Sequence, residues 1–300
     1  MTARVAVLVN PVAGRGRGAA AGRAAIARLR ELGAEVRELE GASAAEAREL
    51  VGAALAERPD ALVVVGGDGT LASILDVLVG ADVPVALVPA GTGNDLARSL
   101  GLPPAGAESA ARAAELALSG RIRDIDIGEI GIGDRRTRFL TIAALGFDAH
   151  VADRTNRLRR PRGRARYYLA LVIELVRLRP MRFSLRVDGG PPEHRPGILV
   201  AIGNTRSYGG GMPMCPEADP GDGRFDVTHV APIGRLKLLR LFPLLLSGRH
   251  LSRPEVSTLR TALIEVSAPS LVVYADGERI GAGPARFAVL PRALRLRVPG

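Results

Sequence analysis

The sequence predicts an α/β N-terminal domain with a parallel sheet, followed by a β-rich C-terminal domain. In the first part of the chain, buried runs such as RVAVLVN (4–10) and DALVVV (60–65) alternate with runs of helical periodicity. Strands that alternate with helices form parallel sheets covered on both faces. From Arg121 onward the runs are mostly strand-like. We therefore place the domains at 1–122 and 123–300 and, since no linker separates them, expect a cleft where they meet.

The elements of the first domain follow from apolar spacing and from the residues that end each run. One helix shows the pattern clearly, because Ile26, Leu29 and Leu32 share a face and Gly33 closes it. The same reasoning predicts strands at 4–10, 34–39, 60–65 and 83–89, and helices at 18–32, 44–57, 70–79, after Gly93 and at 107–119.

The second domain is mostly strands, with two helices expected at 165–179 and 233–247. The segment VVYADGERIG (272–281) predicts a β-hairpin, because Asp-Gly suits its tight turn. Strands are predicted at 121–132, 136–147, 181–188, 196–203, 225–230, 259–267, 271–275, 285–290 and 294–298.

The net charge of +10 raises the question of nucleic-acid binding. Lys237 is the only lysine, and aromatic residues make up 3% of the chain, too few for base-stacking platforms. We therefore expect no nucleic-acid partner. The arginines are densest in RTNRLRRPRGRARYY (154–168), a stretch that could rest on an anionic bilayer as well as on DNA.

The sequence predicts neither secretion nor a membrane span. Asn10-Pro11 interrupts the first apolar run before a signal-peptide core can form. No run approaches the roughly 18 apolar residues that cross a bilayer. The single cysteine, Cys215, excludes an internal disulfide. We expect a cytoplasmic protein.

Three glycine-rich turns follow predicted strands of the first domain: NPVAGRGRG (10–18), GGDGT (66–70) and PAGTGNDLA (89–97). In open parallel sheets, ligands collect outside these strand ends, and glycine lets backbone amides approach phosphate. Any one of these turns alone could be a plain strand-to-helix connection. Three of them together, two carrying an acid (Asp68 and Asp95), favour a nucleotide site in which a metal ion separates acid from phosphate.

The site lacks the lysine of the familiar G-x-x-x-x-G-K-[ST] loop and has no G-x-G-x-x-G opening a helix. Phosphate would instead be held by backbone amides, by Thr70 and Thr92, and by Arg15 or Arg17.

The glycine turns resemble the diacylglycerol-kinase catalytic domain family, and in particular its soluble bacterial lipid kinases. The resemblance covers essentially the whole chain, from NPVAG (10–14) through GNTRSYGGGMPMCPEADPGDGRFDV (203–227) to DGE (276–278). It implies an ATP-binding domain, a β-rich domain and an active site in the cleft. It also implies ATP and Mg²⁺ as cofactors and transfer of the γ-phosphoryl group to a lipid hydroxyl, with diacylglycerol as the expected acceptor and phosphatidic acid as product.

The resemblance assigns site residues by position. Asp68 and Asp95 would lie on the magnesium network, Glu278 would be the general base, and Asp276 lies beside it as a second catalytic candidate. The nucleotide would be contacted by Asn10, Pro11, Val12, Ala13, Gly14, Gly66, Gly67, Asp68, Gly69, Thr70, Leu71, Ala72, Thr92, Asn94 and Asp95.

The segment DPGDGR (219–224) resembles a separate structural magnesium loop. There Asp222 would give its side chain, and Asp219 and Arg224 would give backbone carbonyls. Two positions depart from the family pattern, Gly41 for a threonine and Ala72 for an asparagine. Each departure weakens one polar contact to the nucleotide.

Simpler interpretations stay open at this point. Asp68 could cap a helix, Asp-Gly at 276–277 suits any hairpin, and DPGDGR could be a solvent-exposed turn. An NAD kinase, which shares the GGDG turn, and a basic nucleic-acid-binding protein are the alternative functions.

The expected partner is a lipid at the membrane surface. Peripheral contact with the inner face of the plasma membrane would use the arginine cluster at 154–166 or an interfacial helix at 233–250. A homodimer is also an open alternative.

Overall fold

The computed structural model describes residues 2–161 and 164–300, and the chain divides into two compact units. Unit 1 comprises Met1–Ile127 and Pro291–Gly300, and unit 2 comprises Gly128–Leu290. The sequence predicts a boundary at 122, with the C-terminal residues in the second domain. In the structure, Pro291–Gly300 belong to unit 1, because the last strand pairs in parallel with a strand of that unit, with Leu296 opposite Val85. Apolar periodicity does not reveal a pairing between segments so far apart.

Unit 1 is an α/β unit with four parallel strands in the order β2-β1-β3-β4. The end of β16 extends the sheet beside β4. Its strands are β1 (Arg4–Val9), β2 (Glu35–Leu39), β3 (Ala61–Gly66) and β4 (Val85–Pro89), and its helices are α1 (Ala13–Glu31), α2 (Ala44–Ala56), α3 (Asp68–Ser73), α4 (Leu75–Leu78), α5 (Asp95–Ser99) and α6 (Ala107–Ser119).

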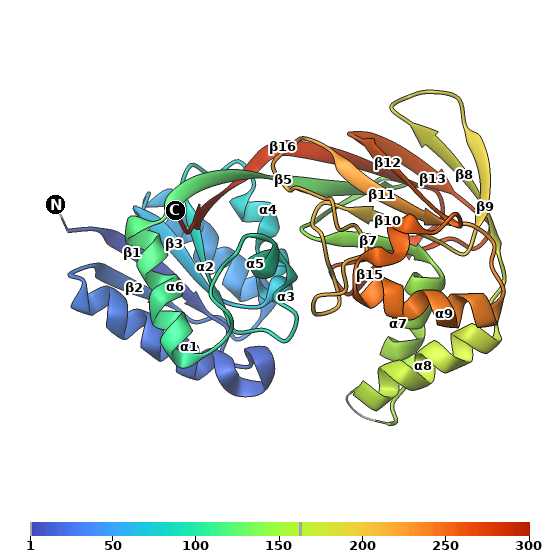
Figure 1. Cartoon of the computed structure of the whole chain (residues 1–300). Coiled ribbons are helices and arrows are strands. Elements are labelled where there is room, and N and C mark those ends of the chain that lie inside the picture. The colour runs from blue at the N-terminus through green and yellow to red at the C-terminus, as the bar shows by residue number, and fades with distance from the viewer. Residues whose placement is uncertain (1, 162–163) are drawn as a thin grey trace. The chain divides into compact units, whose positions relative to one another are not determined.

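Helices cover both faces of this sheet (Figure 1). One face buries alternate strand residues such as Val7 and Val63 against α1 and α6. On the other face, α2 packs on β1 and α3 packs on β3. The start of α2 shows how the sequence fixes an element: the Ser43 hydroxyl accepts from Glu46 N, while the Glu46 carboxylate accepts from Ala42 N.

Unit 2 is a sandwich of two sheets. One sheet contains β16, β13, β8 and β9 with β5 and β6, and the other has the order β12-β11-β10-β7-β14-β15. Its strands are β5 (Arg121–Ile132), β6 (Arg135–Phe139), β7 (Ile142–Gly146), β8 (Met181–Val187), β9 (Glu193–Gly197), β10 (Leu199–Gly203), β11 (Phe225–Val230), β12 (Val256–Thr261), β13 (Leu263–Ser267), β14 (Val272–Ala275), β15 (Glu278–Ala282) and β16 (Ala285–Val298). The strands β5 and β16 each run from one unit into the other.

The core of the sandwich is filled by apolar side chains of both sheets, and Phe139 and Phe225 stack with ring centroids 5.7 Å apart. A second core lies on the outer face of the β10–β11 sheet, where Leu238, Leu241 and Leu245 of α9 pack. The helices of unit 2 are α7 (Phe147–Arg157), α8 (Arg164–Val176), α9 (Arg235–Leu246) and the 3₁₀ helix η1 (Arg249–Ser252). The expected fold class, α/β followed by a β-rich unit, is confirmed (Figure 1).

Several predicted elements are wrong in extent. The predicted strands 136–147, 196–203 and 259–267 are each two strands, which belong to different sheets. Only one or two residues separate the two strands of each pair, so the sequence reads as one run. Conversely, 285–290 and 294–298 form the single strand β16.

Two predicted helical regions also differ. The predicted helix 70–79 is broken at Ile74, whose φ and ψ of −111° and 5° interrupt the helix between α3 and α4. Helix α7 was not predicted, because its sequence FDAHVADRTNR is polar and has only Ala149 and Val151 buried.

Candidate active site

The three glycine turns of unit 1 meet at the carboxyl ends of β1, β3 and β4, as the sequence predicts. Backbone hydrogen bonds join them in sequence order: Asn10 N donates to Val65 O at 3.0 Å, and Ala90 N donates to Gly66 O at 2.8 Å. The Asn10 side-chain amide donates to the Thr70 hydroxyl at 2.9 Å, which ties the first turn to the second. Segments about 60 residues apart in the chain thus meet at one edge of the sheet.

Several glycines in these turns are required by close packing. A methyl group on Gly91 would lie 2.5 Å from the Cα of Gly67, and one on Gly14 would lie 2.0 Å from Ala90 O. Gly14 also has a φ of +57°, a backbone conformation that residues with side chains rarely adopt. By contrast, a methyl on Gly69 would meet nothing within 4 Å. The turns therefore approach one another more closely than any residue with a side chain would allow.

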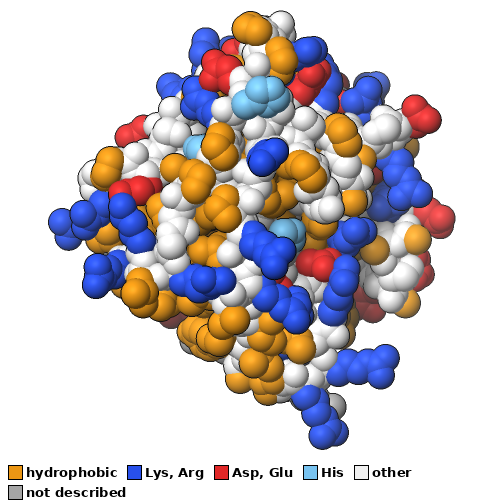
Figure 2. Space-filling model, turned by 90° about the vertical axis from the view of Figure 1, so that its right-hand side faces the viewer, with side chains coloured by type: hydrophobic (Ala, Val, Ile, Leu, Met, Phe, Trp, Pro, Cys, Tyr) orange, Lys and Arg blue, Asp and Glu red, His pale blue; other side chains and the backbone are white. Residues whose placement is uncertain are grey.

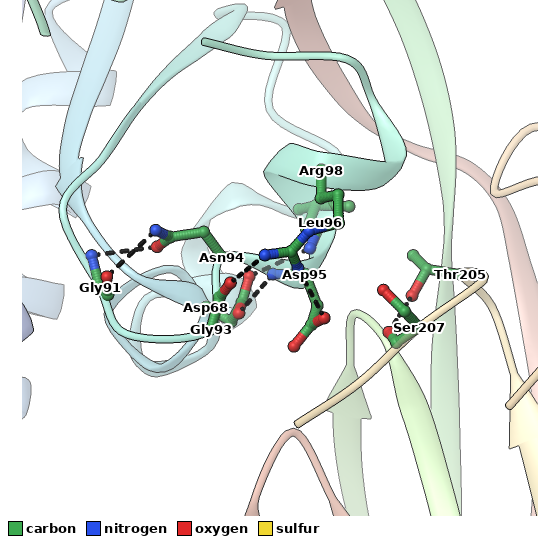
Figure 3. Close-up of polar contacts among 9 residues, drawn as sticks. All are labelled: Asp68, Gly91, Gly93, Asn94, Asp95, Leu96, Arg98, Thr205 and Ser207. Atoms are coloured by element: carbon green, nitrogen blue, oxygen red, sulfur yellow. Dashed lines mark hydrogen bonds and ion pairs between the residues drawn. The ribbon is translucent and has the colours of Figure 1, made fainter. Parts of the chain in front are cut away.

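Polar side chains fix the turn that follows β4. Asn94, in the left-handed conformation, accepts from Gly91 N at 3.0 Å and donates to Gly91 O at 3.1 Å (Figure 3). Arg17 reaches the same carbonyl oxygen at 2.9 Å and also donates to Gly14 O at 3.0 Å. The Arg17 guanidinium thus bridges the first and third turns by donating to a backbone carbonyl oxygen of each.

Asp68 caps the start of α5. Its Oδ2 accepts from Asp95 N at 2.8 Å and its Oδ1 accepts from Leu96 N at 3.2 Å (Figure 3). Burial raises the pKa of Asp68, and the two backbone amides act in the opposite direction. The capping interpretation of Asp68 is therefore correct, but the helix it caps lies one strand further along the chain. Each carboxylate oxygen has a second lone pair, so capping does not exclude a metal ion.

Asp95 lies next to Asp68, so the structure brings the two predicted magnesium residues together. Asp95 is 4% exposed, and its Oδ1 pairs with Arg98 at 3.1 Å. The charge of Asp95 is among the causes that raise the pKa of Asp68. Two neighbouring carboxylates fit Mg²⁺, which uses one or two carboxylates together with phosphates and water. A bound magnesium ion would also relieve the repulsion between them.

The other predicted nucleotide residues line or flank the same surface. Gly66, Gly67 and Leu71 form a small pocket with Asp68 and Asn94, of about 10 Å³. Pro11, Val12, Gly69 and Thr92 are exposed, and Ala13 and Ala72 are half-buried. Their contact with a nucleotide stays a prediction.

In the DGE turn of unit 2, the two acids have different surroundings. Asp276 and Gly277 have positive φ values of 51° and 84°, as in a two-residue hairpin turn between β14 and β15. Asp276 accepts from Leu140 N at 2.8 Å, and from Thr141 N and the Thr141 hydroxyl at 2.9 and 2.6 Å. Asp276 thus anchors the bend between β6 and β7. Glu278, at the start of β15, is exposed.

The DPGDGR segment is a tight turn closed by its own carboxylates. Asp219 Oδ1 accepts from Gly221 N at 3.0 Å, and Asp222 Oδ1 accepts from Arg224 N at 2.9 Å. The other oxygen of Asp222 is bound by the guanidinium of Arg260, a residue that the sequence did not single out. The described residues contain no group of three acidic, histidine or cysteine side chains placed to hold a metal. The guanidinium of Arg260 therefore competes with any cation for the Asp222 side chain, and a magnesium loop of Asp219, Asp222 and Arg224 stays a prediction.

We expect Asp222→Ala to lower the free energy of unfolding by about 1 kcal/mol, equally in EDTA and in MgCl₂. The half-exposed pair with Arg260 contributes little, and most of the loss comes from the hydrogen bond to Arg224 N. Thermal denaturation without nucleotide measures it, with Asp134→Ala on another turn as control. Stabilisation of the wild type by MgCl₂ that disappears in Asp222→Ala would show instead that the loop binds magnesium.

Unit 2 also holds polar contacts that sequence reasoning missed. Asp148, in the first turn of α7, accepts from the Tyr208 hydroxyl, and burial raises the pKa of Asp148 to about 6. Asp153, further along α7, accepts from the Tyr274 hydroxyl at 3.0 Å. Because α7 itself was not predicted, no signal indicated that its acids face tyrosines of two other segments.

Comparisons with known proteins match the chain in two parts. Residues 4–130 match the diacylglycerol kinase catalytic domain, and residues 141–298 match the YegS C-terminal NAD kinase beta sandwich-like domain. A protein of Mycobacterium tuberculosis named diacylglycerol kinase is 44% identical over 297 residues, covering 99% of this chain and 95% of the relative. A Klebsiella pneumoniae protein named "Probable lipid kinase YegS-like" is 30% identical, covering 80% of this chain and 78% of the relative. These matches confirm the resemblance found in the sequence.

Solved structures share the fold. A diacylglycerol kinase from Bacillus anthracis superposes with a TM-score of 0.73 at 20% identity, covering 98% of this chain and 96% of that one. An NAD kinase from Archaeoglobus fulgidus in complex with ATP gives a TM-score of 0.55 at 18% identity, covering 98% and 93%. At these identities the likeness concerns the fold alone.

Proposed function

Because the chain belongs to the diacylglycerol kinase catalytic domain family and is a kinase, we propose that it transfers the γ-phosphoryl group of ATP to a lipid hydroxyl. The proposed acceptor is diacylglycerol, and the product is phosphatidic acid. One observation carries the proposal: the interlocked glycine turns, with Asp68 and Asp95 side by side, occur in a chain 44% identical to a protein named diacylglycerol kinase.

Unit 1 would bind the nucleotide. The glycine turns leave backbone amides without side-chain cover, and such amides suit phosphate oxygens. Asp68 and Asp95 would hold magnesium, which neutralises triphosphate charge when bound. The side-chain hydrogen bonds of Asn10 and Asn94 would fix the turns in place before the nucleotide binds. A site assembled in advance loses less entropy on binding.

Unit 2 would supply the base. Glu278 would accept the proton of the lipid hydroxyl as that oxygen attacks the γ-phosphorus, while Asp276 fixes the turn that presents Glu278. Asp276 already accepts three hydrogen bonds, so its capacity to take a proton from substrate is smaller. The structure therefore favours Glu278 as the base and Asp276 as a positioning residue.

The two alternative functions have less support. The fold is shared with an NAD kinase, but fold likeness at 18% identity says nothing about the acceptor. The relatives of higher identity are named for lipid kinases. Membership of a kinase family also speaks against a purely nucleic-acid-binding protein.

Incubation with γ-labelled ATP, magnesium and a panel of acceptors tests the proposal. The panel contains diacylglycerol, ceramide, monoacylglycerol and NAD, with products separated by thin-layer chromatography. We expect label in phosphatidic acid and none in NADP. Label in NADP alone, or in no lipid, would contradict the proposed function.

The proposed site of action is the inner face of the plasma membrane. In the part of the chain that the structure describes, no helix is long and apolar enough to cross a bilayer. The proposed acceptor is a membrane lipid, so the proposed function calls for contact with the bilayer surface.

A further inference from the structure

Helix α9 exposes a stripe of leucines to solvent. Leu236, Leu239 and Leu246 are 74%, 52% and 57% exposed. Their spacing places them, with Pro243, along one side of the helix. The opposite side is buried, since Leu238, Leu241 and Leu245 pack into the core of unit 2. The exposed leucines are therefore not among the residues that pack α9 against the sheet.

Helix α8 exposes a second apolar stripe. Tyr168, Leu169, Val172 and Val176 are exposed, and Val176 is 64% accessible. The guanidinium of Arg235, the first residue of α9, donates twice to Val176 O, at 3.0 and 2.8 Å. The end of one apolar stripe thus lies beside the start of the other. Figure 2 shows hydrophobic side chains gathered in the lower part of this face, with arginines around them.

Basic residues surround the two stripes. Arg177, Arg179, Lys237, Arg240, Arg249 and Arg253 are all exposed. The segments 164–179 and 233–253 contain a single acid, Glu174, which is buried and paired with Arg154. Lys237 pairs with Glu255, while among the described residues Arg240 has no ion pair. The face thus combines apolar side chains with an excess of positive charge.

The arginine cluster at 154–166 contributes less than its sequence suggests. Arg154 pairs with Glu174 and so joins α7 to α8, while Arg157 pairs with Asp153 at 2.8 Å within α7. Arg159 and Arg160 are exposed, and residues 162 and 163 lie outside the described residues. Part of the charge in this cluster therefore stabilises unit 2.

We propose that the α8–α9 face, defined by these two stripes and their basic rim, docks on an anionic lipid bilayer. A bilayer offers an apolar interior to the leucines and negative headgroups to the arginines. A second copy of the chain would bring the same positive rim against itself, which disfavours self-association through this face. The inference rests on the proposed function, which requires access to a membrane lipid, and it names the surface that meets the membrane.

Vesicle co-sedimentation of the full-length protein without ATP tests the inference. We expect partitioning to phosphatidylcholine vesicles containing 30% phosphatidylglycerol and much weaker partitioning to pure phosphatidylcholine. The double variant Leu236→Gln, Leu239→Gln should lower the partition coefficient on the order of tenfold, because two exposed leucines lose apolar contact with the bilayer. Arg240→Glu should lower it roughly 25-fold, since each charge near the surface is worth about a factor of five and the reversal changes two charges.

Matched controls lie outside the face. Leu32→Gln and Arg182→Glu alter an exposed leucine and an exposed arginine elsewhere and should partition like the wild type. Equal partitioning of all variants, or no preference for anionic vesicles, would overturn the docking surface. So would a wild-type dimer that the leucine variant converts to monomer. Because partitioning is measured without ATP, a failure to phosphorylate any lipid would overturn the proposed function and leave this readout unchanged.

Discussion

Glu278→Gln is expected to lower the rate of phosphoryl transfer about a hundredfold to ten-thousandfold, with nearly normal affinity for Mg-ATP. Glutamine keeps the size of the side chain and removes only its basicity. Glu278 is exposed at the start of β15, and the turn before it is held by Asp276. The substitution should therefore leave the fold of unit 2 intact.

Single-turnover transfer to a short-chain diacylglycerol, beside calorimetric titration of ATP, measures both quantities. Asp276→Asn is the matched comparison. We expect it to lower thermal stability, because an asparagine cannot accept from Leu140 N and Thr141 N with both of its polar atoms. If Glu278→Gln transfers at the wild-type rate while a folded Asp276→Asn does not, the base is Asp276.

Asp68→Asn is expected to lower turnover about a hundredfold or more and also to lower the free energy of unfolding by about 1–3 kcal/mol. Its amide group would face a backbone N–H that now binds a carboxylate oxygen, so one cap of α5 is lost and a donor is left unpaired. Removal of one charge that positions magnesium accounts for the effect on rate.

Different measurements report the loss of stability and the loss of turnover separately. Thermal denaturation without nucleotide reports the cap, and magnesium dependence of turnover at a temperature where the variant is folded reports the metal. Glu49→Gln, an exposed acid on α2, is the control and should change neither. Normal turnover by folded Asp68→Asn would show that Asp68 is a structural cap alone.

The sequence predicts the arrangement of the glycine turns in unit 1 well, because its signals are local. Glycines after buried strands predict turns, and the βα alternation predicts that those turns share one edge of a sheet. What each polar side chain contacts was not predictable. Asp68 reaches the amide of Asp95, and Arg17 reaches Gly91 O; both partners lie on another strand's turn, and only the folded sheet brings them together.

The sequence predicts unit 2 less completely, since only one or two residues separate consecutive strands that belong to different sheets. The bend at Leu140 and Thr141 depends on a carboxylate from residue 276. Likewise, Arg260 lies opposite Asp226 on the neighbouring strand and reaches Asp222 from there. Cross-strand partners of this kind follow from register, which a single sequence does not determine.

We propose that this chain moves the γ-phosphoryl group of ATP onto diacylglycerol. The most direct measurement is the quantity of label in phosphatidic acid and of ADP formed from γ-labelled ATP, with a short-chain diacylglycerol that needs no bilayer. We expect one labelled phosphatidic acid for each ADP, dependent on magnesium and on Glu278. ADP formation without labelled lipid, or label transferred to phosphatidic acid equally well by Glu278→Gln, would contradict it.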